Sequence, residues 1–164
     1  MVYILIPMYN EELNLPNLHA RLLNVLPDYQ KYFVFVDDCS SDTSVKLIHE
    51  LFQGTDFTVL TKEKNEGPGH SFNLGMEWVI AHSKNIEKDI LVTMEADCTS
   101  DVEILPAMVT LSKLGYDFVL ASVYAQGGGF QKTSFLRKSL SFAANMLFRA
   151  IYDVKVLTLS SFYR

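Results

Sequence analysis

Cysteine is scarce in this chain of 164 residues: there are two, Cys39 and Cys98, and they do not form a CxxC pair. Two separated cysteines cannot build the disulfide framework of a small secreted domain, and they lack the spacing of a zinc site. A reducing compartment is the simpler expectation. We therefore expect a cytoplasmic protein.

Long hydrophobic runs are also missing. The apolar opening, residues 1–7, stops after a few positions and lacks the basic flank and long apolar region of a signal peptide, so we expect it to be a first strand. No run approaches the roughly 18 to 20 apolar residues that a membrane-spanning helix requires. The sequence predicts no membrane-spanning segment but is compatible with a surface that contacts a membrane.

Basic residues are outnumbered, with 14 Lys and Arg against 19 Asp and Glu and a formal net charge of -5. General affinity for nucleic-acid backbones requires clustered Lys and Arg on one face, so we expect no nucleic-acid partner. Any phosphate that the protein binds must be held locally. The 49% hydrophobic content is typical of a globular protein, and the length fits a single domain, 1–164. The oligomeric state is not indicated.

A glycine-rich turn after the first expected strand is absent, because residues 7–12 read PMYNEE. Dinucleotide-binding oxidoreductases carry Gly-X-Gly-X-X-Gly at this place. Nucleotidyltransferases usually carry a glycine-rich, basic loop there. The sequence therefore disfavours both classes, although a nucleotidyltransferase shares the expected sheet and metal chemistry and is kept as an alternative.

What the chain does contain is a regular alternation of short buried runs and amphipathic segments. The runs are rich in β-branched and aromatic residues and begin about thirty residues apart, the rhythm of βαβ units. Asn14, Asp42 and Pro68 stand where helices are expected to start. We predict an open, mostly parallel α/β sheet with helices on both faces and a ligand crevice at the carboxyl ends of the strands. The expected strands are residues 2–6, 33–36, 57–60, 90–94 and 118–121.

The pattern changes after Ala121. Residues 124–132 contain three consecutive glycines and are expected to connect to a helix over 134–151, which is apolar almost all round. Such a helix is either enclosed in a larger protein or lies at a membrane interface, and both alternatives stay open. The chain stops soon after a strand-like run at 154–157 without a closing helix, so we expect a truncated C-terminus.

Polar residues follow three of the expected strands. In the first cluster, residues 7–12, Pro7 is expected to end the strand, Tyr9 offers a flat face for a base, and Glu11 can accept hydrogen bonds from a base or ribose. The alternative is an ordinary strand-to-helix turn. In such a turn Asn10 or Asn14 would cap the helix.

The second cluster, residues 36–42, contains Asp37 and Asp38 side by side. Adjacent side chains at a strand end point in different directions, so one carboxylate can brace the loop while the other reaches the crevice. We expect Asp38 to accept from a uracil or guanine N–H. The alternative is an Asp-rich turn that caps the next helix, which accounts for Asp42.

The third cluster, residues 93–99, contains Glu95 and Asp97. Residues two apart on an extended backbone project to the same side, so the two carboxylates are expected to lie together. Such a pair suits Mg²⁺ or Mn²⁺, which take few protein oxygens and complete their shell with water and substrate phosphate. The alternative is a solvated acidic turn.

Taken together, these motifs resemble family-two glycosyltransferases of the GT-A fold, and especially the dolichol-phosphate and polyprenyl-phosphate mannose and glucose synthases. Residues 6–11 are similar to the family's Pro-X-Tyr-Asn-Glu, and residues 37–42 to its Asp-Asp-Gly-Ser-X-Asp. Residues 65–70 stand at its Gly-Leu-Gly turn, and Glu95-Ala96-Asp97 replaces its Asp-Ala-Asp. The region from 127 to 164 is similar to the acceptor side of that family.

The resemblance implies an inverting transferase that moves a sugar from a nucleoside-diphosphate sugar, of the GDP-mannose or UDP-glucose type, to polyprenyl or dolichyl phosphate at the cytoplasmic face of a membrane. Residues 124–151 would form the acceptor loop and interfacial helix. A divalent metal, Mg²⁺ or Mn²⁺, would be held by Glu95 and Asp97, with Asp97 and Arg137 acting in catalysis and Arg137 facing the lipid phosphate. The residues implied to contact the nucleotide sugar are Pro7, Tyr9, Glu11, Val36, Asp38, Glu95, Ala96, Asp97 and Thr99.

Two positions depart from the family pattern. Glu95 is one methylene longer than the usual Asp, and Val123 stands where these synthases usually carry an Arg that clamps phosphate. Either another side chain supplies that charge, or the acceptor differs, or activity is weak. A non-catalytic, degenerate member of the same fold is therefore the second alternative.

Overall fold

The computed structural model describes residues 1–129, 134–152, 158 and 163–164. These residues fall into two compact units, one formed by Met1–Val119 with Tyr163–Arg164 and the other by Leu120–Phe162. The candidate site lies in the first unit.

The first unit is built on four parallel strands, β1 (Val2–Met8), β2 (Lys31–Asp37), β3 (Phe57–Thr61) and β4 (Ile90–Thr93), in the order β3-β2-β1-β4. The helices α1 (Leu15–Asn24), α2 (Ser44–Leu51) and α3 (Pro68–His82) connect them. A short 3-10 turn, η1 (Val102–Ile104), leads into α4 (Leu105–Lys113). The open parallel α/β sheet predicted from the alternation is confirmed.

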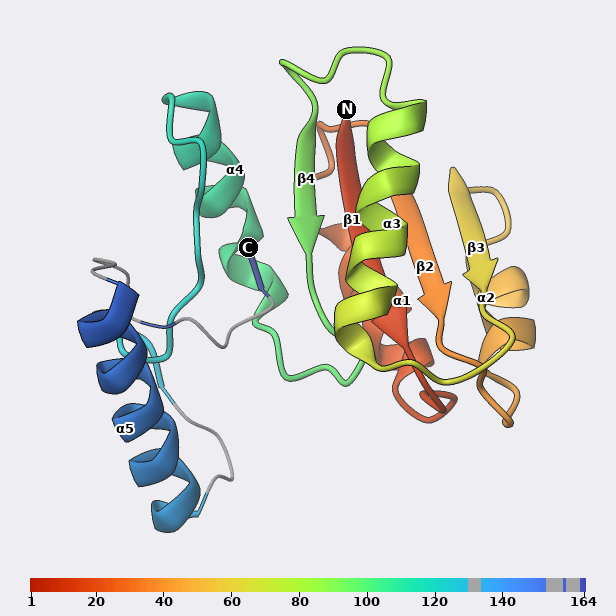
Figure 1. Ribbon diagram of the computed structural model, residues 1–164. Coiled ribbons are helices and arrows are strands. Elements are labelled where there is room, and N and C mark those ends of the chain that lie inside the picture. Colours follow the sequence, from red (N-terminus) through yellow and green to blue (C-terminus); the bar gives the residue numbers. More distant parts are fainter. Residues whose placement is uncertain (130–133, 153–157, 159–162) are drawn as a thin grey trace. The chain divides into compact units, whose positions relative to one another are not determined.

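The strand order places a topological switch point between β1 and β4. The chain moves outward from β1 through β2 to β3, and α3 then returns it to the other side of β1. Since βαβ crossovers are right-handed, reversing direction moves the helix to the opposite face. Figure 1 shows α3 in front of β1 and β2, with α1 and α2 behind the sheet. Loops that leave β1 and β4 diverge at this point, where open α/β sheets bind ligands.

The core lies on both faces of β1 and β2. Every residue of β1 is buried, as are the last five of β2, which explains why these strands read as continuous apolar runs. On the face covered by α1 and α2, Phe33, Phe35 and Phe52 pack edge to face. On the other face Gly75 of α3 lies directly against Leu5.

Pro7 does not end the first strand, contrary to the sequence prediction: β1 continues through Met8, whose carbonyl accepts from the Asp38 amide at 2.9 Å. The carbonyl of Leu5 accepts from the Met94 amide. The backbone N–H and C=O groups of Leu5, and of every second residue after it, therefore point toward β4. The nitrogen of Pro7, which carries no hydrogen, therefore faces a place where β4 has already ended. The strand loses no ladder bond there.

Residues 118–121 do not form the expected strand. Within the described residues, the outer edge of β4 pairs with Arg164, whose carbonyl accepts from the Thr93 amide at 2.7 Å and whose amide donates to the Thr93 carbonyl at 3.2 Å. An apolar run predicts burial, but a strand also requires a hydrogen-bonding partner. Residues 118–121 do not pair with that edge.

The second unit contains α5 (Phe135–Tyr152), so the helix expected over 134–151 is confirmed. The strand-like run at 154–157 lies outside the described residues. None of the helices in the described parts of the chain is long and apolar enough to cross a membrane. Exposed large apolar side chains on α5 are Leu136, Leu140, Phe142, Met146, Leu147, Phe148, Ile151 and Tyr152.

Candidate functional site

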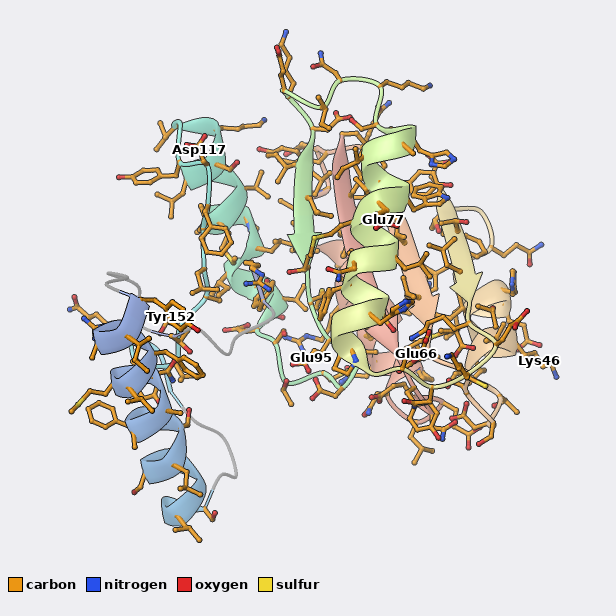
Figure 2. All side chains as sticks on the ribbon, in the orientation of Figure 1. Lys46, Glu66, Glu77, Glu95, Asp117 and Tyr152 are labelled. Atoms are coloured by element: carbon orange, nitrogen blue, oxygen red, sulfur yellow. The ribbon has the colours of Figure 1, made fainter. Side chains whose placement is uncertain are left out.

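Three acidic loops meet at the carboxyl-end edge of the sheet. Because β1, β2 and β4 are parallel, the residues that follow Met8, Asp37 and Thr93 leave the sheet at the same end. Figure 2 shows Glu95 and Glu66 at this end of the sheet, with Glu77 further along α3. The predicted convergence of Asp38 and Asp97 on one edge is therefore found.

The loop after β1 is tied to the loop after β2 through side chains. The Asn10 amide donates to Ser40 Oγ at 2.9 Å, and the Asn10 carboxamide oxygen accepts from the Ser41 amide at 2.8 Å. Glu12 Oε2 accepts from the backbone and hydroxyl of Thr43 at 3.0 and 2.7 Å. Asn10 and Glu12 are therefore committed to holding the two loops together.

This bracing decides which side chains of the first cluster remain open. Tyr9 is 47% exposed and can present its ring to a ligand. The backbone amide of Glu11 donates to Ser44 Oγ at 2.8 Å. One oxygen of its carboxylate accepts from the side-chain amide of Asn14 at 2.6 Å. Asn14 thus supports Glu11 and makes no side-chain capping bond to α1.

Pro7 and Val36 are register partners in the sheet, and both are buried. A contact of their side chains with a nucleoside stays a prediction. Asp42, by contrast, supports the start of α2 from the position before the N-cap Thr43, because its Oδ1 accepts from the Ser44 amide at 2.9 Å.

Asp38 is buried and is not the open carboxylate that the sequence predicts. Its Oδ1 accepts from Lys62 Nζ at 2.5 Å and from the Glu66 amide at 2.9 Å, and its Oδ2 accepts from the Gly67 amide at 2.8 Å. Burial by itself would raise the pKa of Asp38, but these hydrogen bonds and the Lys62 charge outweigh it and lower the pKa below its ordinary value. Asp37 braces its own loop by accepting from the Ser40 amide.

Lys62 was not identified from the sequence. Its side chain is only 4% exposed, and its ammonium also lies 3.6 Å from Glu66 Oε2. The one signal was a lysine immediately after the apolar run of β3, and a lysine in that place reads as an ordinary exposed residue. Only the fold shows that its partner comes from the neighbouring strand.

Left-handed backbone conformations mark the same edge. Among the described residues, Asn10, Cys39 and Cys98 have φ values of 57°, 65° and 60°, and each follows the end of a different strand. Non-glycine residues rarely adopt this conformation, and such strain gathers at functional sites. At position 39 the resembled motif carries glycine, the residue that this geometry favours.

Glu95 lies just beyond the end of β4 and Asp97 lies in the turn that follows, so the two are not on an extended strand, yet they remain close enough to interact. Burial, followed by the charges of Asp97 and Glu11, raises the pKa of Glu95. The Glu95 carboxylate has no hydrogen-bond or ion-pair partner within the described residues. Asp97 Oδ1 accepts from the amide and hydroxyl of Thr99 at 3.0 and 2.8 Å, and Ala96 between them is buried.

This donor set fits a hard divalent cation. A half-buried carboxylate whose charged neighbours are also carboxylates gains from a positive ion. In the described part of the chain no three acidic, His or Cys side chains converge closely enough to hold a metal alone. A cation at this edge would therefore need water and substrate oxygens, as Mg²⁺ usually does.

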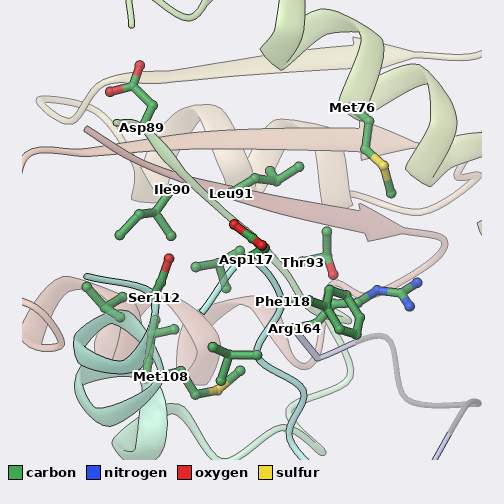
Figure 3. A pocket seen from close by; sticks show the side chains of 14 residues that line it. Met76, Asp89, Ile90, Leu91, Thr93, Met108, Ser112, Asp117, Phe118 and Arg164 are labelled. Atoms are coloured by element: carbon green, nitrogen blue, oxygen red, sulfur yellow. The ribbon is translucent and has the colours of Figure 1, made fainter. Parts of the chain in front are cut away.

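A cavity lies elsewhere, along the outer side of β4, with a volume of about 310 Å³. Figure 3 shows Ile90 and Leu91 of β4, Met108 of α4, and Phe118 beside Arg164. The Arg164 guanidinium lies 5.8 Å from the Phe118 ring centre. None of the predicted site residues lines this cavity, so we assign the site to the acidic edge.

Arg137 belongs to α5, and its side chain is outside the described part of the structure. Val123 also lies in the second unit and is partly exposed. The predicted role of Arg137 toward a phosphate stays a prediction.

Comparison with known proteins identifies the family of this chain. The sequence pattern of Glycosyl transferase family 2 matches residues 3–161. The dolichol-phosphate mannosyltransferase of Pyrococcus furiosus is 32% identical over 158 residues, which are 94% of this chain and 43% of that protein. The polyprenol monophosphomannose synthase of Mycolicibacterium smegmatis is 28% identical over 163 residues, 98% of this chain and 59% of that protein. The chain thus spans about half the length of these relatives.

The fold is shared with solved structures. Glucosyl-3-phosphoglycerate synthase from Mycobacterium tuberculosis, solved in complex with UDP, matches 99% of this chain and 55% of its own with a TM-score of 0.60 at 15% identity. At that identity the likeness concerns the fold alone, and it agrees with the GT-A-like sheet expected from the sequence. Because the family pattern covers nearly the whole chain, this protein belongs to glycosyl transferase family 2.

Proposed function

We propose that the protein transfers a hexose from a nucleoside-diphosphate sugar to a polyprenyl-type phosphate with the help of Mg²⁺ or Mn²⁺. The observation that carries the proposal is the half-buried Glu95 beside the switch point between β1 and β4, where the charges of Asp97 and Glu11 add to burial in raising its pKa. Relatives named as polyprenyl-phosphate sugar transferases support the acceptor class.

In this proposal Asp97 and Glu95 hold the divalent cation, and Thr99 orients Asp97 by donating to its Oδ1. When bound, the cation offsets the charge that develops on the leaving nucleoside diphosphate. Tyr9 stacks on the base, and Asp38 and Glu11 accept from base and ribose. The cation would also allow the diphosphate to bind at this edge, because the carboxylates alone would repel it.

The acceptor phosphate attacks the anomeric carbon from the face opposite the leaving group, and the configuration inverts. A phosphate monoester is already ionised at neutral pH, so a strong general base is unnecessary. The absence of a need for a base agrees with the described carboxylates at this edge, which either hold the loops through hydrogen bonds or are proposed to bind the cation. Arg137 would face the lipid phosphate.

The lipid acceptor requires contact with a membrane, which we assign to α5 at the cytoplasmic face. Its exposed apolar side chains, including Leu140, Phe142 and Leu147, suit a helix that lies in the interface. The protein is accordingly proposed to be peripheral.

The test combines binding and turnover. Calorimetry with UDP-glucose and GDP-mannose, with and without Mn²⁺, measures donor binding; transfer to polyprenyl phosphate in vesicles then measures catalysis. We expect metal-dependent binding and turnover in the wild type, and the loss of both in Asp97→Ala. The matched control Glu77→Ala changes an exposed carboxylate on α3 and should behave as wild type. Full activity of Asp97→Ala would remove the proposed metal role, and binding without turnover would favour the non-catalytic alternative suggested by Val123 and Glu95.

A further inference from the structure

We infer that Lys62 is a positioning residue that leaves Asp38 with a single free acceptor, so that the site prefers a uracil nucleotide to a guanine nucleotide. This inference rests on the proposed function and narrows its donor class.

The number of free acceptor positions on Asp38 can be counted. A carboxylate offers about four acceptor positions, two on each oxygen. Lys62 Nζ and the Glu66 amide occupy both positions on Oδ1, and the Gly67 amide occupies one on Oδ2. One position remains, and it lies on Oδ2. The side chain of Asp38 is 6% exposed, so a ligand reaches only a narrow part of the carboxylate.

Lys62 is held firmly enough to fix this arrangement. Its own amide donates to the Asp37 carbonyl at 2.9 Å and continues the ladder between β2 and β3. Its ammonium lies between the carboxylates of Asp38 and Glu66, at 2.5 and 3.6 Å. A buried ammonium between two anions is satisfied in place, so it keeps Oδ1 occupied and is not free to follow a ligand phosphate.

The two candidate bases differ in the donors that they present. Uracil has one ring N–H, whereas guanine presents a ring N–H and an exocyclic amino N–H side by side. Two parallel donors match a carboxylate with both oxygens open, but a single acceptor leaves one guanine donor unpaired. An unpaired buried donor is costly, and we expect at least about a tenfold weaker affinity for the guanine nucleotide. Tyr9 does not alter this choice, because both bases have a flat face for stacking.

Calorimetric titration of the protein with UDP and with GDP, both in the presence of Mn²⁺, tests the preference. CDP is the reference, because cytosine has no ring N–H. We expect UDP to bind about tenfold or more tightly than both GDP and CDP. Equal or tighter binding of GDP would overturn the inference and leave the proposed function intact. If no nucleotide binds, the proposed function fails and the inference fails with it.

Variants of Lys62 separate positioning from a structural effect. Lys62→Met frees one position on Oδ1 and should reduce the preference for UDP over GDP to within about threefold, while Lys62→Arg keeps the donor and should retain it. A preference unchanged in Lys62→Met would contradict the inference. Should Lys62→Met fail to fold, Asp38→Asn supplies the decision, since loss of the carboxylate must reduce UDP affinity toward that of CDP.

The pH dependence gives a further readout. The charged side chains that face Asp38 are Lys62 and Glu66, and His70 lies 3.4 Å from Glu66. The terminal phosphate of UDP titrates between pH 7 and 5 and affects both proteins alike, so the readout is the difference between their pH profiles. With Lys62 present, Asp38 stays ionised over this range. Loss of the lysine removes a hydrogen bond and a charge that both lower the pKa of Asp38, so UDP affinity should fall more steeply with decreasing pH in Lys62→Met than in the protein that keeps Lys62. Both proteins are compared in a His70→Gln background, which removes the neighbouring imidazole, and parallel pH profiles would count against a positioning role.

Discussion

Gly75, in the middle of α3, lies so close to Leu5 of β1 that a β-carbon on the glycine would come within 2.1 Å of the leucine Cδ1. The helix therefore approaches the strand at the distance that only a hydrogen side chain allows. Leu5 is fully buried and cannot move aside into solvent.

Replacing this glycine should destabilise the sheet-helix packing. We expect Gly75→Ala to lower the free energy of unfolding by about 1–3 kcal/mol, because overpacking outweighs the better helix propensity of alanine. Gly69→Ala is the matched control: it lies in the same helix with nothing within 4 Å of the added carbon, so stability should be unchanged or rise by up to about 1 kcal/mol. Urea unfolding measures both. Equal effects would contradict the packing argument.

Glu95 should reduce stability near neutral pH in the absence of metal. Its folded-state pKa lies above the ordinary value of 4.5, so between these two values the folded protein binds more protons than the unfolded chain. The contribution of Glu95 is therefore favourable below that window and declines as the pH rises through it. We expect Glu95→Gln to raise the midpoint of thermal unfolding at pH 7 by about 1–2 °C, a small effect because half of the group is solvated.

At pH 4, where the carboxyl group is largely protonated, the wild type and Glu95→Gln should melt together. Glu77→Gln removes an exposed carboxylate from α3 and should show neither effect. A Glu95→Gln variant less stable than wild type at pH 7 would show that the carboxylate has a favourable partner.

Cys39 occupies a turn that suits glycine. Its φ of 65° costs a side-chain-bearing residue roughly 1–2 kcal/mol, part of which is offset by the larger conformational entropy that glycine loses on folding. We expect Cys39→Gly to raise the free energy of unfolding by up to about 1 kcal/mol. Cys39→Ala keeps the strain and removes only the weak contact of the thiol with the Glu63 carbonyl, so it isolates that contribution. Chemical denaturation under reducing conditions measures both variants.

The exposed face of α5 should control association with lipid vesicles. Leu140 and Leu147 are 63% and 59% exposed. Replacing both with Glu should reduce co-sedimentation with anionic vesicles by at least about tenfold, since each leucine contributes roughly 1.5–3 kcal/mol when buried in the interface. Gln53→Glu with Asn73→Glu adds the same charge outside α5. Equal losses in the two double variants would mean that charge alone, not α5, governs binding.

The first four strands and their helices were predictable because their sequence signals are local. Continuous apolar runs bounded by turn residues identify buried parallel strands, and parallel strands bring their carboxyl ends to one edge whatever the details of packing. The grouping of Asp38 with Glu95 and Asp97 follows from this topology alone.

Other features depend on partners that the sequence does not name. The burial of Asp38 follows from Lys62, whose ion pair forms across two strands. Pro7 remains in its strand because of where β4 happens to end, and 118–121 stays outside the sheet because an apolar run does not specify which edge it will join. These outcomes are decided by tertiary hydrogen bonds, which leave no local pattern.

The side chains of Asn10 and Glu12 accept hydrogen bonds from amides of the neighbouring loop. In return, the Ser40 hydroxyl of that loop accepts from the Asn10 amide. Either loop transplanted alone into another protein would arrive with donors and acceptors that its new neighbour does not match. Exchange of these loops between related proteins, by recombination or by grafting, therefore requires both segments to be transferred together.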